Sequence, residues 1–85
     1  MQQLNDKLQV VIRKREGILF EGEAWALSSI NDVGPFDVLA YHSNFVSPLN
    51  EKIVVHISRK ETKEFVVNKG VMRVEENKVE VYVGI

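Results

Sequence analysis

The segment Lys78-Val79-Glu80-Val81-Tyr82-Val83 decides the fold class of this 85-residue chain, because a valine stands at every second position. In an extended strand successive side chains point to opposite faces, so the three valines share one face. In a helix the same valines would be spread around the cylinder. The β-branched side chain of valine also suits a pleated surface. The segment is therefore predicted to be a strand with one buried face.

The same alternation recurs in two other parts of the sequence. Near the start it places Leu8, Val10 and Ile12 on one face, and in the middle it does the same for Ile53, Val55 and Ile57. Five further short strands are indicated by their residue types, at residues 18–20, 23–30, 36–41, 64–67 and 71–75. In the segment 23–30 the alternation places Trp25 and Leu27 on one side.

Polar, turn-forming residues separate these segments, at residues 31–35, 47–51, 59–63 and 76–77. Strands that recur every 8 to 12 residues or so, without a helix long enough to join parallel strands, favour antiparallel pairing. We therefore predict an all-β fold, an antiparallel β-sandwich of about 8–10 short strands. A chain of this length forms one core, so residues 1–85 are expected to be a single domain.

The composition argues against several classes of protein. Eleven basic and 12 acidic residues give a net charge of −1, which is not the strongly basic balance of a nucleic-acid-binding domain. The absence of cysteine excludes disulfide frameworks, thiolate zinc sites and cysteine nucleophiles. No apolar run reaches the roughly 18 residues of a membrane-spanning helix. Any contact with a membrane is therefore expected to be indirect.

Neither histidine stands in a catalytic pattern. His42 has no nucleophile at the spacing of a known motif, and the carboxylates that precede it are Asp37 and Asp32. We expect His42 to fix a loop by hydrogen bonding or to belong to an interface, and His56 to be a half-exposed surface residue. The sequence also contains no phosphate-binding loop, dinucleotide fingerprint or metal-ligand spacing. We therefore predict that the chain is not an enzyme and has no cofactor or metal.

Other residues are candidates for contacts with partners. The basic run Arg13-Lys14-Arg15 is interpreted as a solvated loop, with a phosphate or lipid-headgroup contact as the alternative. Trp25 is expected to anchor the core or an interface. Apolar residues that alternation places away from the core indicate a partner surface, although a strand buried on both sides would explain some of them equally well. These residues are Val11, Val54, Val66 and Tyr82.

Four blocks of the sequence, in the same order and at similar spacing, resemble the β-sandwich domain of the ε subunit of F-type ATP synthases. Residues 8–22 resemble its opening strand, loop and Phe-x-Gly sequence. Residues 34–42 resemble the family's central segment, which ends in a histidine, here His42, and residues 43–49 resemble the segment that follows it. Residues 65–81 resemble its closing Gly-x-x-x-Val and Asn-x-Val region. The blocks cover nearly all of the chain.

This resemblance implies a non-catalytic subunit of the rotor stalk. Such a domain would pack against the γ subunit of the central shaft, with Val11, Val54, Val66 and Tyr82 as the candidate γ-facing surface. A loop region near His42 would touch the membrane-embedded c-ring, and its candidate residues are Asp32, Pro35, Tyr41 and His42. The domain would then join γ to the ring, so that ion-driven rotation is coupled to ATP synthesis. It would lie at the cytoplasmic side of the inner or plasma membrane, as a peripheral component, or in the equivalent organellar compartment.

The sequence also departs from the family pattern. Ala40 and Tyr41 stand where members usually have Pro-Gly, and Asp37 replaces a glycine, which changes the backbone angles open to this loop. The family's C-terminal helical hairpin has no counterpart in these residues, so no role tied to that hairpin is inferred. The alternative interpretation is a free-standing β-sandwich that binds proteins or carbohydrates. With one Trp and two Tyr, the chain has few aromatic residues for carbohydrate binding.

Overall fold

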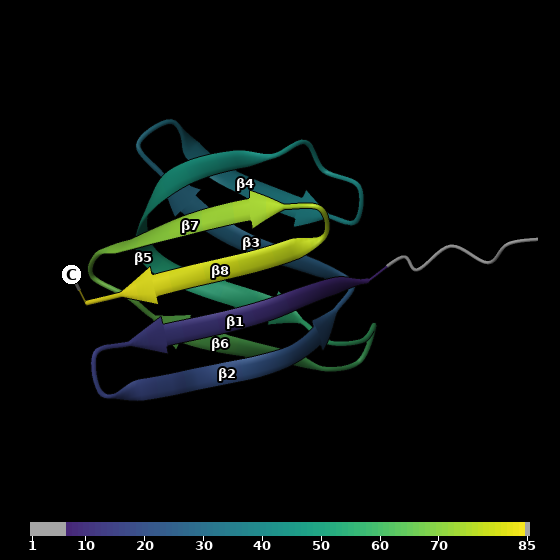
Figure 1. Cartoon of the computed structure of the whole chain (residues 1–85), viewed down its shortest axis with the longest axis horizontal. Helices are drawn as coiled ribbons and strands as arrows, with labels where there is room; N and C mark the ends of the chain where they lie inside the picture. The colour runs from purple at the N-terminus through teal and green to yellow at the C-terminus, as the bar shows by residue number, and fades with distance from the viewer. Residues whose placement is uncertain (1–6, 85) are drawn as a thin grey trace, which may run out of the picture.

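The computed structural model describes residues 7–84, which form eight β-strands without any helix (Figure 1). Residues 1–6 and 85 of the predicted single domain lie outside the described part. The prediction of an all-β sandwich is confirmed. The strands are β1 (Leu8–Lys14), β2 (Gly17–Ala24), β3 (Ala26–Asn31), β4 (Gly34–Leu39), β5 (Phe45–His56), β6 (Thr62–Val66), β7 (Gly70–Glu75) and β8 (Lys78–Val83).

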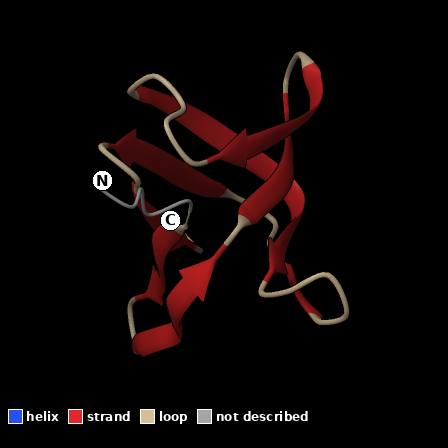
Figure 2. Ribbon diagram, turned by 90° about the vertical axis from the view of Figure 1, so that its right-hand side faces the viewer, coloured by secondary structure: helices blue, strands red, loops and turns tan. Residues whose placement is uncertain are grey.

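The strands form two layers that share β5 (Figure 2). Sheet A has the order β2-β1-β8-β7 and is completed by residues 45–49 of β5. Sheet B contains β4 and β3, residues 50–56 of β5, and β6. One pair departs from the predicted antiparallel pattern, because β1 and β8 run parallel, with Val10 opposite Val79 and Ile12 opposite Val81. Two distant segments of the sequence thus meet at the centre of sheet A.

The predicted turn at residues 47–51 is wrong, because these residues lie inside β5. Ser47 and Leu49 are buried and alternate with exposed Val46 and Pro48, so the strand continues through the polar residues. The hydroxyl of Ser47 is satisfied inside the fold, since it donates to the Pro48 carbonyl at 2.8 Å and accepts from Asn31 Nδ2 at 3.0 Å. The sharp change of direction falls at Glu51, which has φ 71°. There β5 leaves sheet A and enters sheet B.

The predicted strand at residues 23–30 is also corrected, because it is interrupted at Trp25. Strand β2 ends at Ala24 in sheet A and β3 begins at Ala26 in sheet B, so the chain bends between the two layers. The Trp25 N–H donates to the His56 carbonyl at 3.0 Å and holds this bend. Trp25 is 40% exposed whereas Leu27 is fully buried. The two side chains therefore do not share one side, and Trp25 is not part of the core.

The core lies between the two sheets and consists of the alternating residues predicted from the sequence. Val79, Val81 and Val83 face Leu8, Val10 and Ile12 of β1 within the same buried cluster. Burial of each such side chain contributes about 1.5–3 kcal/mol relative to exposure. Phe20 of β2 and Phe65 of β6 close one side of the sandwich, with ring centroids 6.1 Å apart. The two sheets are thereby fixed to one another, and their outer faces and ends are held in place.

Candidate functional site

The only cluster of polar side chains that resembles catalytic chemistry in the described range lies on sheet B. Ser28 Oγ donates to Asp37 Oδ1 at 2.6 Å and lies 2.9 Å from His56 Nε2. In a nucleophilic triad the histidine stands between the serine and the carboxylate, so that it can accept the serine proton. Here the serine stands between the other two and donates its hydrogen bond to Asp37. The arrangement therefore fixes β3, β4 and β5 to one another and does not activate a nucleophile.

His42 makes contacts within its own loop, as the predicted role of fixing that loop requires. Its backbone N–H donates to the Leu39 carbonyl at 3.2 Å, and its Nδ1 lies 2.8 Å from the Ser43 carbonyl. The ring packs on Phe45, with centroids 4.8 Å apart. These contacts hold the loop between β4 and β5. Within residues 7–84 no group of three His, Asp or Glu side chains is placed to hold a metal ion.

The outer face of sheet A is rich in charge. Alternation and register place apolar Val11, Val46, Val71 and Tyr82 on this face. They are interspersed with charged residues on every neighbouring strand except β5, so no continuous apolar patch results. These charged residues are Arg13, Glu21, Glu23, Arg73, Glu75, Lys78 and Glu80.

The outer face of sheet B carries fewer charged residues. Its charged residues are Asp37, which Ser28 binds, Lys52 and Glu64. A shallow hollow of 410 Å³ opens on this face between β3, β4 and β5, with Ser28 and His56 among its lining residues. The apolar residues that register places on this face are Ala26, Ile30, Pro35, Leu39, Val54 and Val66. We call this surface the sheet B face.

The four predicted γ-facing residues do not form one surface. Val54 and Val66 lie on the sheet B face, on the neighbouring strands β5 and β6. Val11 and Tyr82 lie on the outer face of sheet A, on the opposite side of the core. Alternation along each strand identifies which residues point outward, but it does not tell which sheet a strand joins. Of the two pairs, Val54 and Val66 have the less charged surroundings.

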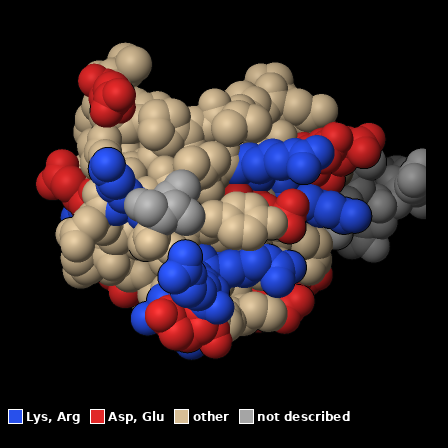
Figure 3. All heavy atoms as spheres, turned by 60° about the vertical axis from the view of Figure 1, so that its left-hand side comes forward, with Lys and Arg blue, Asp and Glu red and all other residues tan. Residues whose placement is uncertain are grey.

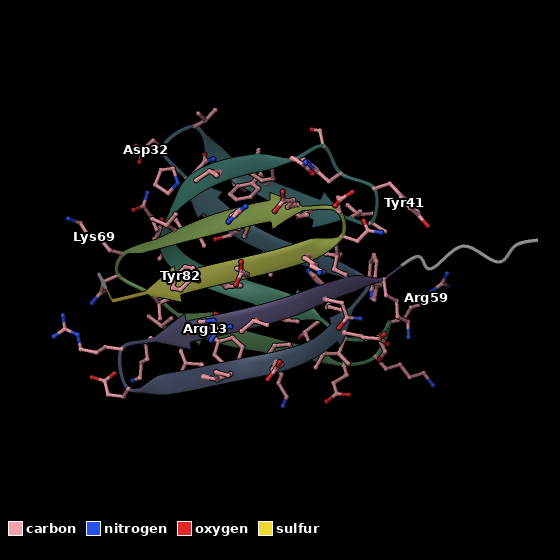
Figure 4. All side chains as sticks on the ribbon, viewed as in Figure 1. Arg13, Asp32, Tyr41, Arg59, Lys69 and Tyr82 are labelled. Atoms are coloured by element: carbon pink, nitrogen blue, oxygen red, sulfur yellow. The ribbon has the colours of Figure 1, made fainter. Side chains whose placement is uncertain are left out.

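The four predicted ring-facing residues are also separated, because strand β4 lies between them. Asp32 and Pro35 lie at the turn that precedes or begins β4, whereas Tyr41 and His42 follow its end at Leu39. Figure 4 shows Asp32 and Tyr41 at opposite ends of the molecule. The four residues therefore do not belong to one loop. We refer to the two ends as the Asp32 end and the Tyr41 end.

At the Asp32 end the β3–β4 turn projects from the sandwich. Asn31 Oδ1 accepts hydrogen bonds from the backbone N–H groups of Val33, at 2.9 Å, and Gly34, at 3.3 Å, and so fixes the turn. Asp32 accepts a hydrogen bond from Asn50 Nδ2 at 3.1 Å. Val33 at the tip is 96% exposed. A rigid turn thus presents a carboxylate and an uncovered apolar side chain next to one another.

At the Tyr41 end two loops hold each other. Asn77 Oδ1 accepts from the Tyr41 N–H at 2.6 Å, and Asn44 Oδ1 accepts from the Glu76 N–H at 3.1 Å. Tyr41, Glu76 and Asn77 all have positive φ, so the reversals are tight. The departure from Pro-Gly at Ala40 and Tyr41 is therefore accommodated by a left-handed tyrosine that a neighbouring turn stabilises. The loop at this end is therefore held by the turn between β7 and β8.

The fold and these surfaces define the class as a small β-sandwich domain whose two outer faces differ in charge. Residues 7–84 match the model of the ATP synthase delta/epsilon chain β-sandwich domain. The chain therefore belongs to this family, which is a non-catalytic part of ATP synthase. The match covers every described residue, so the interpretation as an unrelated free-standing binding module is set aside.

Individual relatives agree with the family. The chain is 32% identical over 78 residues to an ATP synthase epsilon chain of Sulfurimonas denitrificans, which covers 91% of this chain and 60% of that protein. Its fold is similar to a chain in the Euglena gracilis mitochondrial ATP synthase, with a TM-score of 0.86, 15% identity and coverage of 96% of this chain and 53% of the other. The fold is also similar to a chain in the central stalk and c-ring structure of the Tetrahymena thermophila mitochondrial ATP synthase, with a TM-score of 0.76 and 11% identity. That match covers 93% of this chain and 64% of the other.

The sequence spans less than two thirds of each of these proteins. The described residues contain no helix that is long and apolar enough to cross a membrane. Sequence reasoning did not single out Leu39 or the Ser28–Asp37 pair, both of which help to form the sheet B face. In β4 only Asp37 separates Phe36 from Val38, and Leu39 follows Val38 directly, so the pattern does not show which side of the strand faces outward.

Proposed function

We propose that the chain is the rotor-stalk domain that joins the γ shaft of an F-type ATP synthase to its c-ring, and that the sheet B face binds γ. The observation that carries this proposal is the contrast between the two outer faces in a chain of this family. One face is charged on four strands, whereas the other is charged at three positions and has apolar side chains on all four of its strands. Apolar surface that is gathered in this way usually marks a protein interface.

The two faces differ in what burial would cost. On sheet A a partner would have to remove water from many charged groups, and unpaired charges are expensive to bury. On the sheet B face Asp37 already has a hydrogen-bond donor, and Val66 is 82% exposed. Covering Val66, Leu39 and Val54 would bury apolar area, and Lys52 and Glu64, which lie opposite Val66 and Val54, would need partners on γ. This supports Val54 and Val66 as γ-facing residues and removes Val11 and Tyr82 from that surface.

For the ring contact we propose the Asp32 end. The β3–β4 turn projects, is fixed by Asn31, and carries Val33 uncovered at its tip beside Asp32. A polar ring loop that bears a cation would pair with the Asp32 carboxylate and cover Val33. Pro35 belongs to the same end, whereas Tyr41 and His42 are directed to the opposite one. Tyr41 and His42 instead stabilise the loop that follows β4.

The mechanical demand on such a domain is that it transmits torque without deforming. Strand β5 belongs to both sheets, so shear between the layers would have to break hydrogen bonds along one continuous strand. The close-packed core resists the same displacement. The domain would act as a wedge between shaft and ring and would couple ion-driven rotation to ATP synthesis. It would be a peripheral component that meets the membrane only through the ring, at the cytoplasmic face or the equivalent organellar one.

The binding of the chain to its cognate γ subunit tests the proposal. Val66→Asp should weaken the complex by on the order of 10- to 100-fold, because a further charged group, even opposite Lys52, would have to lose its water at the interface. Val46→Asp is the matched control, since Val46 is a 66% exposed valine on the outer face of sheet A. It should leave the affinity within about twofold. Equal losses in the two variants, or a loss confined to Val46→Asp, would contradict the assignment of the face.

A further inference from the structure

Basic side chains gather at the Asp32 end, around Tyr82. Figure 3 shows several Lys and Arg side chains on this side of the molecule, with Asp and Glu side chains among them, and Figure 4 shows Arg13, Lys69 and Tyr82 at the same end. A hollow of 520 Å³ is lined by the basic run 13–15 together with Tyr82, Val83 and Gly84. The Lys69 carbonyl accepts from the Gly84 N–H at 2.8 Å, which places the backbone of Lys69 at the rim. We call Arg13, Lys14, Arg15 and Lys69 the basic cluster.

Arg13 has one buried guanidinium donor without a partner. It lies opposite Tyr82 on the neighbouring strand β8 and is only partly exposed. Its Nε atom is buried and has no hydrogen-bond partner, and none of the ion pairs among residues 7–84 involves Arg13. A buried N–H donor without a partner is unfavourable, and an anion bound by the guanidinium would supply an acceptor.

The other charges at this end leave a positive surplus. Lys14 lies 4.0 Å from Glu16, and both side chains are largely exposed, so this pair is weak. Glu80 lies on the same face two residues before Tyr82, but it stands opposite Val11 and Arg73 and not opposite Arg13. No ion pair in the described range joins a carboxylate to Arg15 or Lys69. An anion that enters the hollow therefore meets several cations.

From this geometry we propose that the hollow binds a phosphate group. The guanidinium of Arg13 has the planar donor geometry that suits tetrahedral oxyanions, and the Tyr82 hydroxyl adds a donor from the adjacent strand. Lys14, Arg15 and Lys69 supply the surrounding positive potential. The phosphate could belong to a solute or to a lipid headgroup, and both offer the same oxygen atoms to Arg13. This site is separate from the sheet B face and does not rest on the function proposed for that face.

The test measures binding of two soluble probes, inorganic phosphate and tripolyphosphate, to the 85-residue chain at constant ionic strength. Chemical shifts of the backbone amides near residues 13–15 and 82–84 should move along saturating curves. Arg13→Gln should weaken binding by about tenfold or more. Arg73→Gln is the control, because it removes the same charge from the same face but from an arginine already paired with Glu75 at 2.8 Å. It should change the affinity by less than about twofold.

A second arm uses vesicles made of equal parts of phosphatidylglycerol and phosphatidylcholine, compared with phosphatidylcholine alone. Arg13-dependent binding to the anionic vesicles alone would identify a lipid headgroup as the source, and Arg13-dependent binding of the soluble probes would identify a solute. Tyr82→Phe, which keeps the ring, should weaken either interaction by a few fold. The proposal is overturned if no probe saturates, or if Arg13→Gln and Arg73→Gln lose affinity equally. Thermal unfolding of each variant shows whether it is folded at the temperature of the titration.

Discussion

Gly70 is the position where the packing between strands leaves least room. It begins β7 and is paired with Val83 of β8 on one side and with Leu49 of β5 on the other. A Cβ atom added there would lie 2.9 Å from the backbone oxygen of Tyr82 and 3.4 Å from Val83 Cγ1. The first distance is shorter than a carbon–oxygen contact allows, and the obstructing atom is backbone. The strands would have to move apart to admit a methyl group.

The expected effect of Gly70→Ala is the difference between two terms. Overpacking of this kind destabilises by about 1–3 kcal/mol. Loss of the glycine restricts the unfolded chain, which adds about 0.4–1 kcal/mol to the free energy of unfolding. The net loss should be about 1–2 kcal/mol, which corresponds to a fall in Tm of very roughly 5–15 °C for a domain of this size.

Urea unfolding measures this change, with the midpoint lowered and the m-value unchanged. Gly22→Ala is the control, because the nearest atom to its added Cβ is the ring carbon Phe20 Cζ at 3.4 Å, at the end of a side chain. That variant should be within about 0.5 kcal/mol of the parent or slightly more stable. If Gly70→Ala proves as stable as Gly22→Ala, the close approach of β7 and β8 described above is wrong.

Two further predictions concern the core and the Tyr41 end. Leu49→Ala should destabilise the domain by about 2–5 kcal/mol, because Leu49 is 1% exposed and lies where β5 leaves sheet A. A urea midpoint near that of the parent would contradict the place of Leu49 in the core. Asn77→Ala should destabilise the domain by about 1–2 kcal/mol, since it removes the acceptor of the Tyr41 N–H and puts alanine at φ 64°. Asn77→Gly also removes the acceptor but suits the backbone conformation, so its loss of stability should be smaller. The same unfolding assay compares the two, and an equal loss would show that the backbone conformation is not important.

The fold class could be predicted because its signal is local. The alternation of Val79, Val81 and Val83 with larger or charged residues is visible within six positions, and the buried face it predicts is the face that the structure buries. The prediction failed where the chain passes between layers. Residues 47–51 contain Ser, Pro and Asn, which favour turns, yet burial of Leu49 and pairing with β7 keep them in a strand.

The candidate surfaces could be predicted only in part, because each depends on which strands become neighbours. Val54 and Val66 are outward-facing residues on adjacent strands, whereas Tyr82 is outward-facing on the other sheet, and nothing in the local pattern distinguishes the two cases. Asp32 and His42 are close in sequence, but an extended strand of six residues holds them at opposite ends. The unpartnered Nε of Arg13 lies where β1 pairs with β8, and the local sequence pattern does not predict that pairing.

The absence of cysteine in the sequence makes single-site labelling straightforward, so cross-linking to the cognate γ subunit is the most direct test of the central claim. A photoreactive group attached to Val66→Cys on the sheet B face is predicted to cross-link to γ within the assembled complex. The same group on Val46→Cys, on the outer face of sheet A, is predicted to remain unlinked. Cross-linking from position 46 and not from position 66, in a complex that has formed, would contradict the account.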